Sequence, residues 1–306
     1  MTVSTPLPIA TRCLSAGHPT DFPTPMKLLR SLTTAVVLVL AAGLHAQDPN
    51  FHVYLCLGQS NMEGYPGIPA EEKAWDDPRF QVLAAVDFPA LGRQQGQWYT
   101  AVPPLCRPNS GMSPADSFGR TLVAALPAPV RVGVVNVSVG GCKIELFDPP
   151  RIADYVANAP VWMKGALAAY GDNPYQRLVD MARLAQRSGV IKGILLHQGE
   201  SNVGDPEWSA KVKSVYDHLL ADLGLSAADV PLLVGGLVPA DQQGKCASMN
   251  AVLAALPQTI PTAHFVASDG CEATADHLHF SPAGYRELGR RYAEAMLPLL
   301  DRRERN

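Results

Sequence analysis

Short apolar segments recur along this chain, and their spacing restricts the fold more than any other feature. They show no clear alternation of polar and apolar residues, and they lie at 51–57, 130–139, 190–196, 231–237 and 263–267. Runs of this length and pattern are typical of strands that are buried on both faces of a sheet. Helical patterns lie between them, at 117–126, 174–188 and 208–223. This alternation predicts a parallel sheet with helices on both of its faces.

The clearest helical signal comes at the end of the chain. Ser281 is suited to an N-cap, and Pro282 follows at the first helical position. Apolar residues then recur at helical spacing, so we expect them to face the core. They are Tyr285, Leu288, Tyr292, Ala295 and Leu299.

Length alone allows one or two domains, and the recurring strands and helices predict a single domain over residues 47–306. The chain is 47% hydrophobic and carries a formal net charge of −3, and it shows no basic stripe of the kind that nucleic-acid or membrane-surface binders use. Residues 65–112 break the rhythm of strands and helices with many Pro, Gly and Gln and a weak strand signal at 81–86. A connection this long is usually functional, so we expect it to fold over the mouth of a site.

The first 46 residues are predicted to lie outside this domain. Residues 1–25 contain five prolines and are expected to be a disordered leader or a misassigned start. Residues 26–46 have the features of a signal peptide: Lys27 and Arg30 precede a short apolar run at 33–44, and cleavage is expected before Gln47. The protein is therefore expected to be secreted or periplasmic, with no membrane insertion after cleavage.

Five cysteines lie within residues 47–306. Disulfides are common in exported proteins, and the pairs Cys246–Cys271 and Cys106–Cys142 are plausible, although the sequence does not fix connectivity. Cys56 lies in an apolar strand pattern and is expected to be a free core thiol. The chain has no Cys-x-x-Cys motif, so a thiolate zinc site is not expected.

Polar side chains follow three of the predicted strands or precede the last helix. Open α/β sheets place ligand sites at the carboxyl ends of their strands. Ser60 stands at a strand-to-helix turn directly after the first strand, where a serine hydroxyl is exposed and can act as a nucleophile, although such a serine can equally be a plain N-cap. The dense polar stretch His-Gln-Gly-Glu-Ser-Asn at 197–202 follows the third strand and either forms a network or faces a substrate.

A serine nucleophile needs a base and an orienting carboxylate, and one loop offers both. Asp276 and His279 are three residues apart just before the last helix, so Asp276 can hold one ring nitrogen of His279 while the other faces Ser60. His277 is a competing base that we expect to point the other way. After the second strand, Gly140 and Gly141 allow a close backbone approach and an N–H for an oxyanion.

Taken together and in this order, these blocks resemble the SGNH-hydrolase superfamily, in particular its sialate O-acetylesterase branch, which includes the acetylxylan esterases of carbohydrate esterase family six. The resemblance covers roughly residues 52–297. It rests on Gly-Gln-Ser-Asn-Met at 58–62, His-Gln-Gly-Glu-Ser at 197–201, Gly140-Gly141, Asp276-x-x-His279-Phe280 and Gly284-Tyr285-x-x-Leu288-Gly289.

The resemblance implies a flavodoxin-like α/β fold, a three-layer sandwich with about five parallel strands. It implies that Ser60 is acylated, that His279 serves as base and then as acid, and that Asp276 orients it. The implied oxyanion hole uses the backbone N–H groups of Ser60 and of Gly141 or its neighbour, and the side chain of Gln198. No metal or organic cofactor is implied.

Four further residues are candidates for auxiliary roles at this site, namely Gln59, Asn61, Gly140 and Glu200. The sequence leaves open whether Glu200 is a second acidic partner of His279 or a residue that fixes its loop. It also leaves open the oligomeric state.

The expected activity is removal of O-acetyl groups from acetylated xylan, a similar polysaccharide or an O-acetylated sialic acid. A lipase-like or arylesterase activity and a non-catalytic carbohydrate-binding protein on the same scaffold are the alternatives. Trp75, Trp98 and Tyr99 in the 65–112 segment, together with several Gln, favour sugar binding, because this mix suits stacking on sugars and hydrogen bonding to their hydroxyls.

Overall fold

A central sheet of seven strands organises the protein. The computed structural model describes residues 47–65 and 67–304, and the predicted leader and signal peptide lie outside these described residues. The strand order is β3-β2-β4-β1-β5-β6-β7. The strands are β1 (Asp48–Gly58), β2 (Phe80–Leu83), β3 (Trp98–Thr100), β4 (Arg131–Ser138), β5 (Gly189–His197), β6 (Leu232–Gly235) and β7 (Ala263–Val266).

The predicted α/β fold is confirmed, and the sheet is larger than expected. The five predicted strands form its core in the order β4-β1-β5-β6-β7, all parallel. Strand β2 adds a sixth parallel strand beside β4, and β3 returns antiparallel to β2. Both extra strands come from the 65–112 segment, where the run near 81–86 was only a weak signal, so part of this segment extends the sheet.

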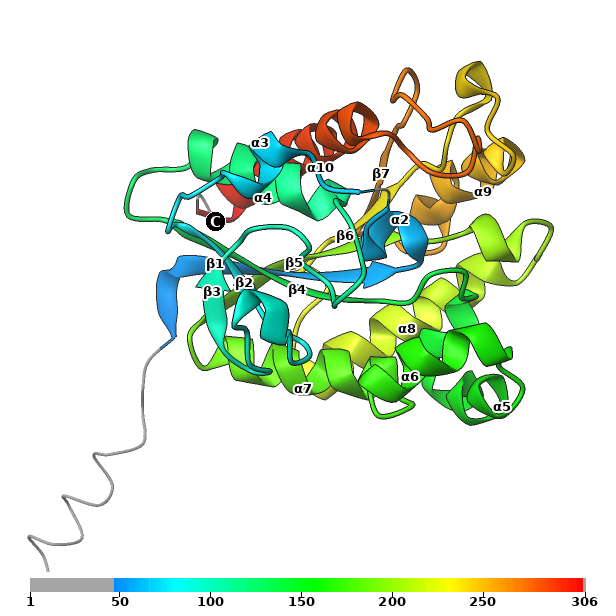
Figure 1. The fold of residues 1–306 in the computed structure, drawn as a ribbon, viewed down its shortest axis with the longest axis horizontal. Coiled ribbons are helices and arrows are strands. Elements are labelled where there is room, and N and C mark those ends of the chain that lie inside the picture. The colour runs from blue at the N-terminus through cyan, green and yellow to red at the C-terminus, as the bar shows by residue number, and fades with distance from the viewer. Residues whose placement is uncertain (1–46, 66, 305–306) are drawn as a thin grey trace, which may run out of the picture. The chain divides into compact units, whose positions relative to one another are not determined.

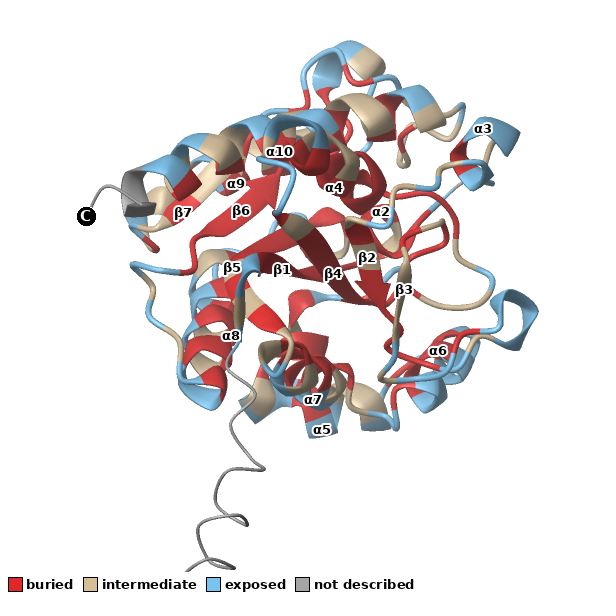
Figure 2. Ribbon diagram, turned by 90° about the vertical axis from the view of Figure 1, so that its left-hand side faces the viewer, coloured by how far each residue is buried: buried red, intermediate tan, exposed pale blue. Residues whose placement is uncertain are grey.

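Helices cover both faces of the sheet, which makes three layers (Figures 1 and 2). Helices α4 (Pro114–Ala125) and α10 (Pro282–Glu304) cover one face, and α7 (Pro174–Gln186) and α8 (Trp208–Leu223) cover the other. The remaining helices are shorter: α2 (Ser60–Glu63), α3 (Ala70–Lys73), α5 (Ile152–Ala157), α6 (Lys164–Ala169) and α9 (Asn250–Ala254). Short 3₁₀ turns join several of these elements.

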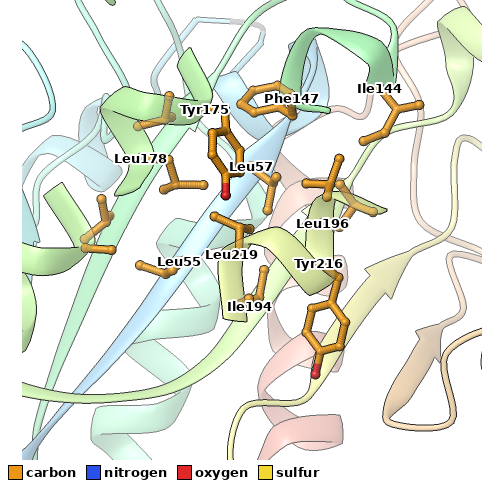
Figure 3. Packing of buried hydrophobic residues seen from close by; sticks show 14 of the residues in the cluster. Leu55, Leu57, Ile144, Phe147, Tyr175, Leu178, Ile194, Leu196, Tyr216 and Leu219 are labelled. Atoms are coloured by element: carbon orange, nitrogen blue, oxygen red, sulfur yellow. The ribbon is translucent and has the colours of Figure 1, made fainter. Parts of the chain in front are cut away.

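The sheet separates two apolar cores, because its strands are buried on both faces. Alternate residues of β1 point to opposite sides: Leu55 and Leu57 belong to the core under α7 and α8, whereas Tyr54 and Cys56 belong to the core under α4 and α10. Figure 3 shows the first of these cores, in which leucine and isoleucine side chains from β1 and β5 pack against Leu178 and Leu219. Strand positions in the middle of the sheet are thereby held firmly on both sides.

The last helix begins at Pro282 as predicted and is longer than the apolar pattern indicated. Tyr285, Leu288 and Tyr292 are fully buried, which confirms their assignment to the core. Ala295 and Leu299 are only partly buried and pack at the edge of that core. Among the described residues, no helix is both long and apolar enough to cross a membrane.

The disulfide expectation was wrong. Cys56, Cys106, Cys142, Cys246 and Cys271 are all free. The sulfurs of the proposed pairs have other partners: Cys106 Sγ lies 3.1 Å from the Tyr170 hydroxyl, whereas Cys142 Sγ donates to the Gly58 carbonyl at 3.6 Å. Cys56 is a buried free thiol, as predicted.

Candidate active site

Ser60 stands where β1 ends, in the middle of the sheet. Gly58 pairs with His197 of β5, and a Cβ atom at Gly58 would lie 2.0 Å from the His197 carbonyl oxygen. Its φ of +153° also disfavours any other residue. This glycine therefore lets β1 pass close to β5 and turn at once into α2, whose first residue is Ser60 (Figure 1).

His279 and Asp276 reach Ser60 from the loop that precedes α10. His279 Nε2 lies 2.9 Å from Ser60 Oγ, and His279 Nδ1 lies 2.6 Å from Asp276 Oδ2. The three side chains therefore form one hydrogen-bonded chain with the geometry that a nucleophile, a base and an orienting acid require. His277 points elsewhere, because its Nδ1 contacts the Gln242 carbonyl at 3.1 Å.

The carboxylate of Asp276 is stabilised in its charged form. Partial burial acts to raise its pKa, but hydrogen bonds from His279, from the Leu278 backbone N–H and from the Thr274 hydroxyl outweigh that effect and hold the pKa well below its usual value. A charged Asp276 fixes Nδ1 of His279 as the protonated nitrogen and leaves Nε2 free to accept a proton from Ser60.

Gly140 and Gly141 lie beside Ser60, as the sequence predicted. A Cβ atom on Gly140 would be 3.7 Å from Ser60 Cβ. The Gly140 N–H donates to the carboxylate of Glu63, which forms an ion pair with Arg107, and Ser201 Oγ donates to the Gly141 carbonyl at 3.0 Å. In the described part of the chain, the N–H groups of Ser60 and Gly141 have no protein acceptor, so both can face a bound oxyanion.

Gln198 does not have the free amide that the expected oxyanion donor requires. Its side chain is fully buried, and Nε2 donates to Asn202 Oδ1 at 2.7 Å and to Gln59 Oε1 and the Cys142 carbonyl at 3.3 Å each. Its Oε1 accepts from Trp208 Nε1 at 2.6 Å. An amide has only two N–H donors, so Gln198 braces the glycine loop in this structure.

Asn61 and Glu200 form a hydrogen-bonded pair that Asn61 ties to the loop carrying His279. Asn61 Nδ2 donates to Glu200 Oε1 at 2.7 Å and to the Leu278 carbonyl at 3.1 Å. Its Oδ1 accepts from the Phe280 N–H and from the Tyr285 hydroxyl. Burial raises the pKa of Glu200 to about 7, although the bond from Asn61 acts to lower it. The Glu200 carboxylate is bonded to Asn61 rather than to His279, which corresponds to the loop-fixing alternative.

The aromatic residues at this site differ from those that the sequence suggested. Trp98 packs edge-on against Phe51 in the core, and Trp75 lies under Arg120. Tyr99 packs against the other core. The exposed rings near Ser60 are instead Tyr65, which stacks on His279 with ring centroids 4.0 Å apart, and Trp162, whose ring lies against Gly141. No sequence motif marked either residue, because both stand outside the recognised blocks: Tyr65 follows α2, and Trp162 lies in the short 3₁₀ turn Val161–Met163.

Among the residues that the structure describes, no group of three or more His, Cys, Asp or Glu side chains could hold a metal ion.

Comparison with known proteins identifies the family. The profile of a family described as carbohydrate esterase, sialic acid-specific acetylesterase, matches residues 50–298, which is most of the chain. The chain belongs to this family of carbohydrate esterases. It is therefore a carboxylic ester hydrolase that acts on O-acetyl groups of carbohydrates.

Solved structures similar to this esterase have the same fold. A protein from Arabidopsis thaliana has a TM-score of 0.62 and 21% identity over 82% of this chain and 99% of its own. The protein NanS has a TM-score of 0.58 and 17% identity over 84% and 100%. A carbohydrate acetylesterase from Xanthomonas citri has a TM-score of 0.52 and 20% identity over 79% of this chain and 55% of its own.

Proposed function

We propose that Ser60, His279 and Asp276 are the catalytic triad of this esterase and that catalysis proceeds through an acetyl-enzyme. The observation that carries the proposal is the unbroken chain of contacts from Asp276 Oδ2 through the His279 ring to Ser60 Oγ, at 2.6 and 2.9 Å. Nε2 of His279 is the only ring nitrogen left for Ser60, since Nδ1 is held by Asp276.

In the first half-reaction, Ser60 Oγ attacks the acetyl carbonyl while His279 Nε2 takes the hydroxyl proton. The C–O bond to the sugar then breaks, and the same nitrogen gives that proton to the departing sugar hydroxyl. In the second half-reaction, His279 takes a proton from water, which attacks the acetyl-serine. Cleavage of that ester returns the proton to Ser60 Oγ and releases acetate.

The negative charge on the tetrahedral oxygen would be held by the N–H groups of Ser60 and Gly141. Each donor of this kind contributes about 10²- to 10³-fold in rate. Glu63 accepts from the Gly140 N–H and Ser201 donates to the Gly141 carbonyl, so the peptide groups before and after the Gly140–Gly141 peptide are both held and the loop is set before substrate arrives. Gln198, which was expected as a third donor, instead donates to the Cys142 carbonyl of this loop.

The substrate is proposed to be an acetylated polysaccharide such as acetylated xylan or an O-acetylated sialic acid. The test measures acetate release from both compounds by the wild type and by Ser60→Ala. Acetate from one substrate that is lost in the variant supports the proposal and names the substrate class. A folded protein that binds the sugars and releases no acetate would favour the binding-protein alternative.

The export of this esterase is also a proposal, which rests on the sequence of residues 26–46. Amino-terminal sequencing of protein recovered from outside the cytoplasm tests it. A start at or near Gln47 supports cleavage of a signal peptide, whereas an intact start at Met1 or Met26 contradicts it.

A further inference from the structure

Two exposed aromatic rings lie near the proposed triad. Tyr65 is 46% exposed and packs on His279, the residue that contacts Ser60 Oγ. Trp162 is 67% exposed, and its ring lies against Gly141. An exposed aromatic residue is ordinary by itself, but Gly141 directly follows Gly140, which lies beside Ser60.

The contact between Trp162 and Gly141 is close. A Cβ atom on Gly141 would lie 2.7 Å from Cη2 of Trp162, and the φ of Gly141 is +69°. Only glycine therefore leaves room for the indole edge at this position. The ring therefore lies beside the residue whose N–H group is proposed to hold the oxyanion, at the edge of the proposed site.

The segment that carries Trp162 is firmly anchored, although its ring is not covered. Met163 is 1% exposed and belongs to the core beneath α7 and α8, and Ala159 and Ala166 on either side are also buried. Val161, the preceding residue, is 82% exposed. The fold therefore holds the backbone in place and leaves the indole largely open to solvent.

We propose that Trp162 is a stacking platform for the pyranose ring that carries the acetyl group. This inference rests on the proposed function of Ser60. A pyranose presents a face of C–H groups that packs on an indole ring, while its hydroxyls stay available to polar groups. Such groups lie beside the platform, because Ser201 Oγ is bonded to the Gly141 carbonyl. A long acyl or alkyl chain would need an extended apolar trough, and beside Gly141 the structure offers a single exposed aromatic ring.

The test compares Trp162→Ala and Trp162→Phe with the wild type. Two sugar probes are used, an acetylated xylo-oligosaccharide and an O-acetylated sialic acid, and ethyl acetate serves as an ester with no ring to stack. Covering about 50 Å² of apolar surface corresponds to roughly tenfold in affinity. We expect Trp162→Ala to lower the ratio of kcat/KM for the hydrolysed sugar probe over that for ethyl acetate by about tenfold, mainly through KM. Trp162→Phe should recover part of this ratio.

Leu91→Ala is the matched control, because Leu91 is an exposed apolar residue (42%) in the Pro89–Leu91 turn, and it should leave the ratio unchanged. Binding of the same sugar probe to Ser60→Ala, with and without Trp162→Ala, is measured by calorimetry. Weaker sugar binding in the variant that lacks the indole supports the platform. If Ser60→Ala keeps its esterase activity, that result overturns only the proposed nucleophile and leaves the binding result in force. An unchanged ratio and unchanged affinity in Trp162→Ala would overturn the platform.

Discussion

His279 Nε2 lies 2.9 Å from Ser60 Oγ, although 219 positions separate the two residues in the chain. The contact depends on the turn that follows β1 and on the loop that precedes α10. Asn61 joins these two segments directly, because it follows Ser60 and bonds to the backbone of Leu278 and Phe280. Hydrogen bonds of one residue, Asn61, thus help to position both the proposed nucleophile and the proposed base.

Asp276→Asn should lower kcat by about 10³- to 10⁴-fold with little change in KM, because the amide no longer fixes the tautomer of His279. The pKa of Asp276 is held well below its usual value, so its carboxylate stays charged on acidification to about pH 5, and the wild type should not lose activity there through this residue. Steady-state kinetics over pH 5–9 check both points. Asp217→Asn, at an exposed pair with Lys213, is the control and should match the wild type.

Glu200→Gln should remove the contribution of Glu200 to the pH dependence of the free energy of unfolding. The pKa of Glu200 is about 7 in the folded protein, against an ordinary value of 4.5. A raised pKa means that the folded state binds the proton more tightly, so this contribution is complete below about pH 4.5 and is lost as the pH rises through 7. The variant should match the wild type at pH 4.5 and exceed it by about 1–3 kcal/mol at pH 8. Urea unfolding at both pH values measures the free energies of unfolding. The same difference between variant and wild type at both pH values would contradict the prediction.

The same variant separates the two roles of Glu200 that the sequence left open. If Glu200 only fixes the loop through Asn61, Glu200→Gln keeps an acceptor at 2.7 Å from Asn61 and kcat should fall by less than about tenfold. A loss as large as that of Asp276→Asn would assign Glu200 a direct part in orienting His279.

Glu63, which accepts from the Gly140 N–H, is expected to position the loop at Gly140 and Gly141 that carries the proposed oxyanion donor. Glu63→Leu should lower kcat by up to about 10²-fold with KM nearly unchanged, since the Gly140 N–H loses its acceptor and the loop shifts relative to Ser60. Glu63→Gln keeps a side-chain oxygen and should recover most of the activity. If both variants lose the same activity, the charge paired with Arg107 matters rather than the bond to Gly140.

The five cysteines of the described residues should behave as free thiols. Burial raises the pKa of Cys106 to about 12 and that of Cys271 to about 11, so little thiolate forms and alkylation of the native protein should be slow. After unfolding without reductant, peptide mapping should find all five alkylated, and reductant should leave Tm unchanged. A peptide pair joined through Cys106 and Cys142 would contradict the structure.

The sequence predicted the core of the sheet because its strands are buried on both faces and so read as apolar runs. It predicted that Ser60, Asp276 and His279 are candidate site residues that meet, because each stands in a short motif at a strand or helix end. It missed β3 and therefore the full number of strands in the sheet. Trp98 and Tyr99 stand in a stretch with no strand pattern, and only their contacts with Phe51 and β2 in the folded chain hold them in a strand. It missed Trp162 for the same reason: only the folded chain brings this ring to Gly141.

Gln198 shows the limit of reasoning from a motif. The residue stands beside the site, as expected, but its donors are used by Gln59, Cys142 and Asn202. Asn202 is only four residues away, but Gln59 and Cys142 come from two distant segments, and no local pattern specifies that they will meet this amide.

The central claim is that Ser60 is the activated nucleophile, and covalent labelling tests it most directly. A fluorophosphonate probe reacts with a serine hydroxyl that an adjacent base activates. Digestion and mass spectrometry should find the label on Ser60 in the wild type and no label at that position in Ser60→Ala, with much slower labelling in Asp276→Asn. Label on another residue, or a folded wild-type protein that takes up none, would contradict the account.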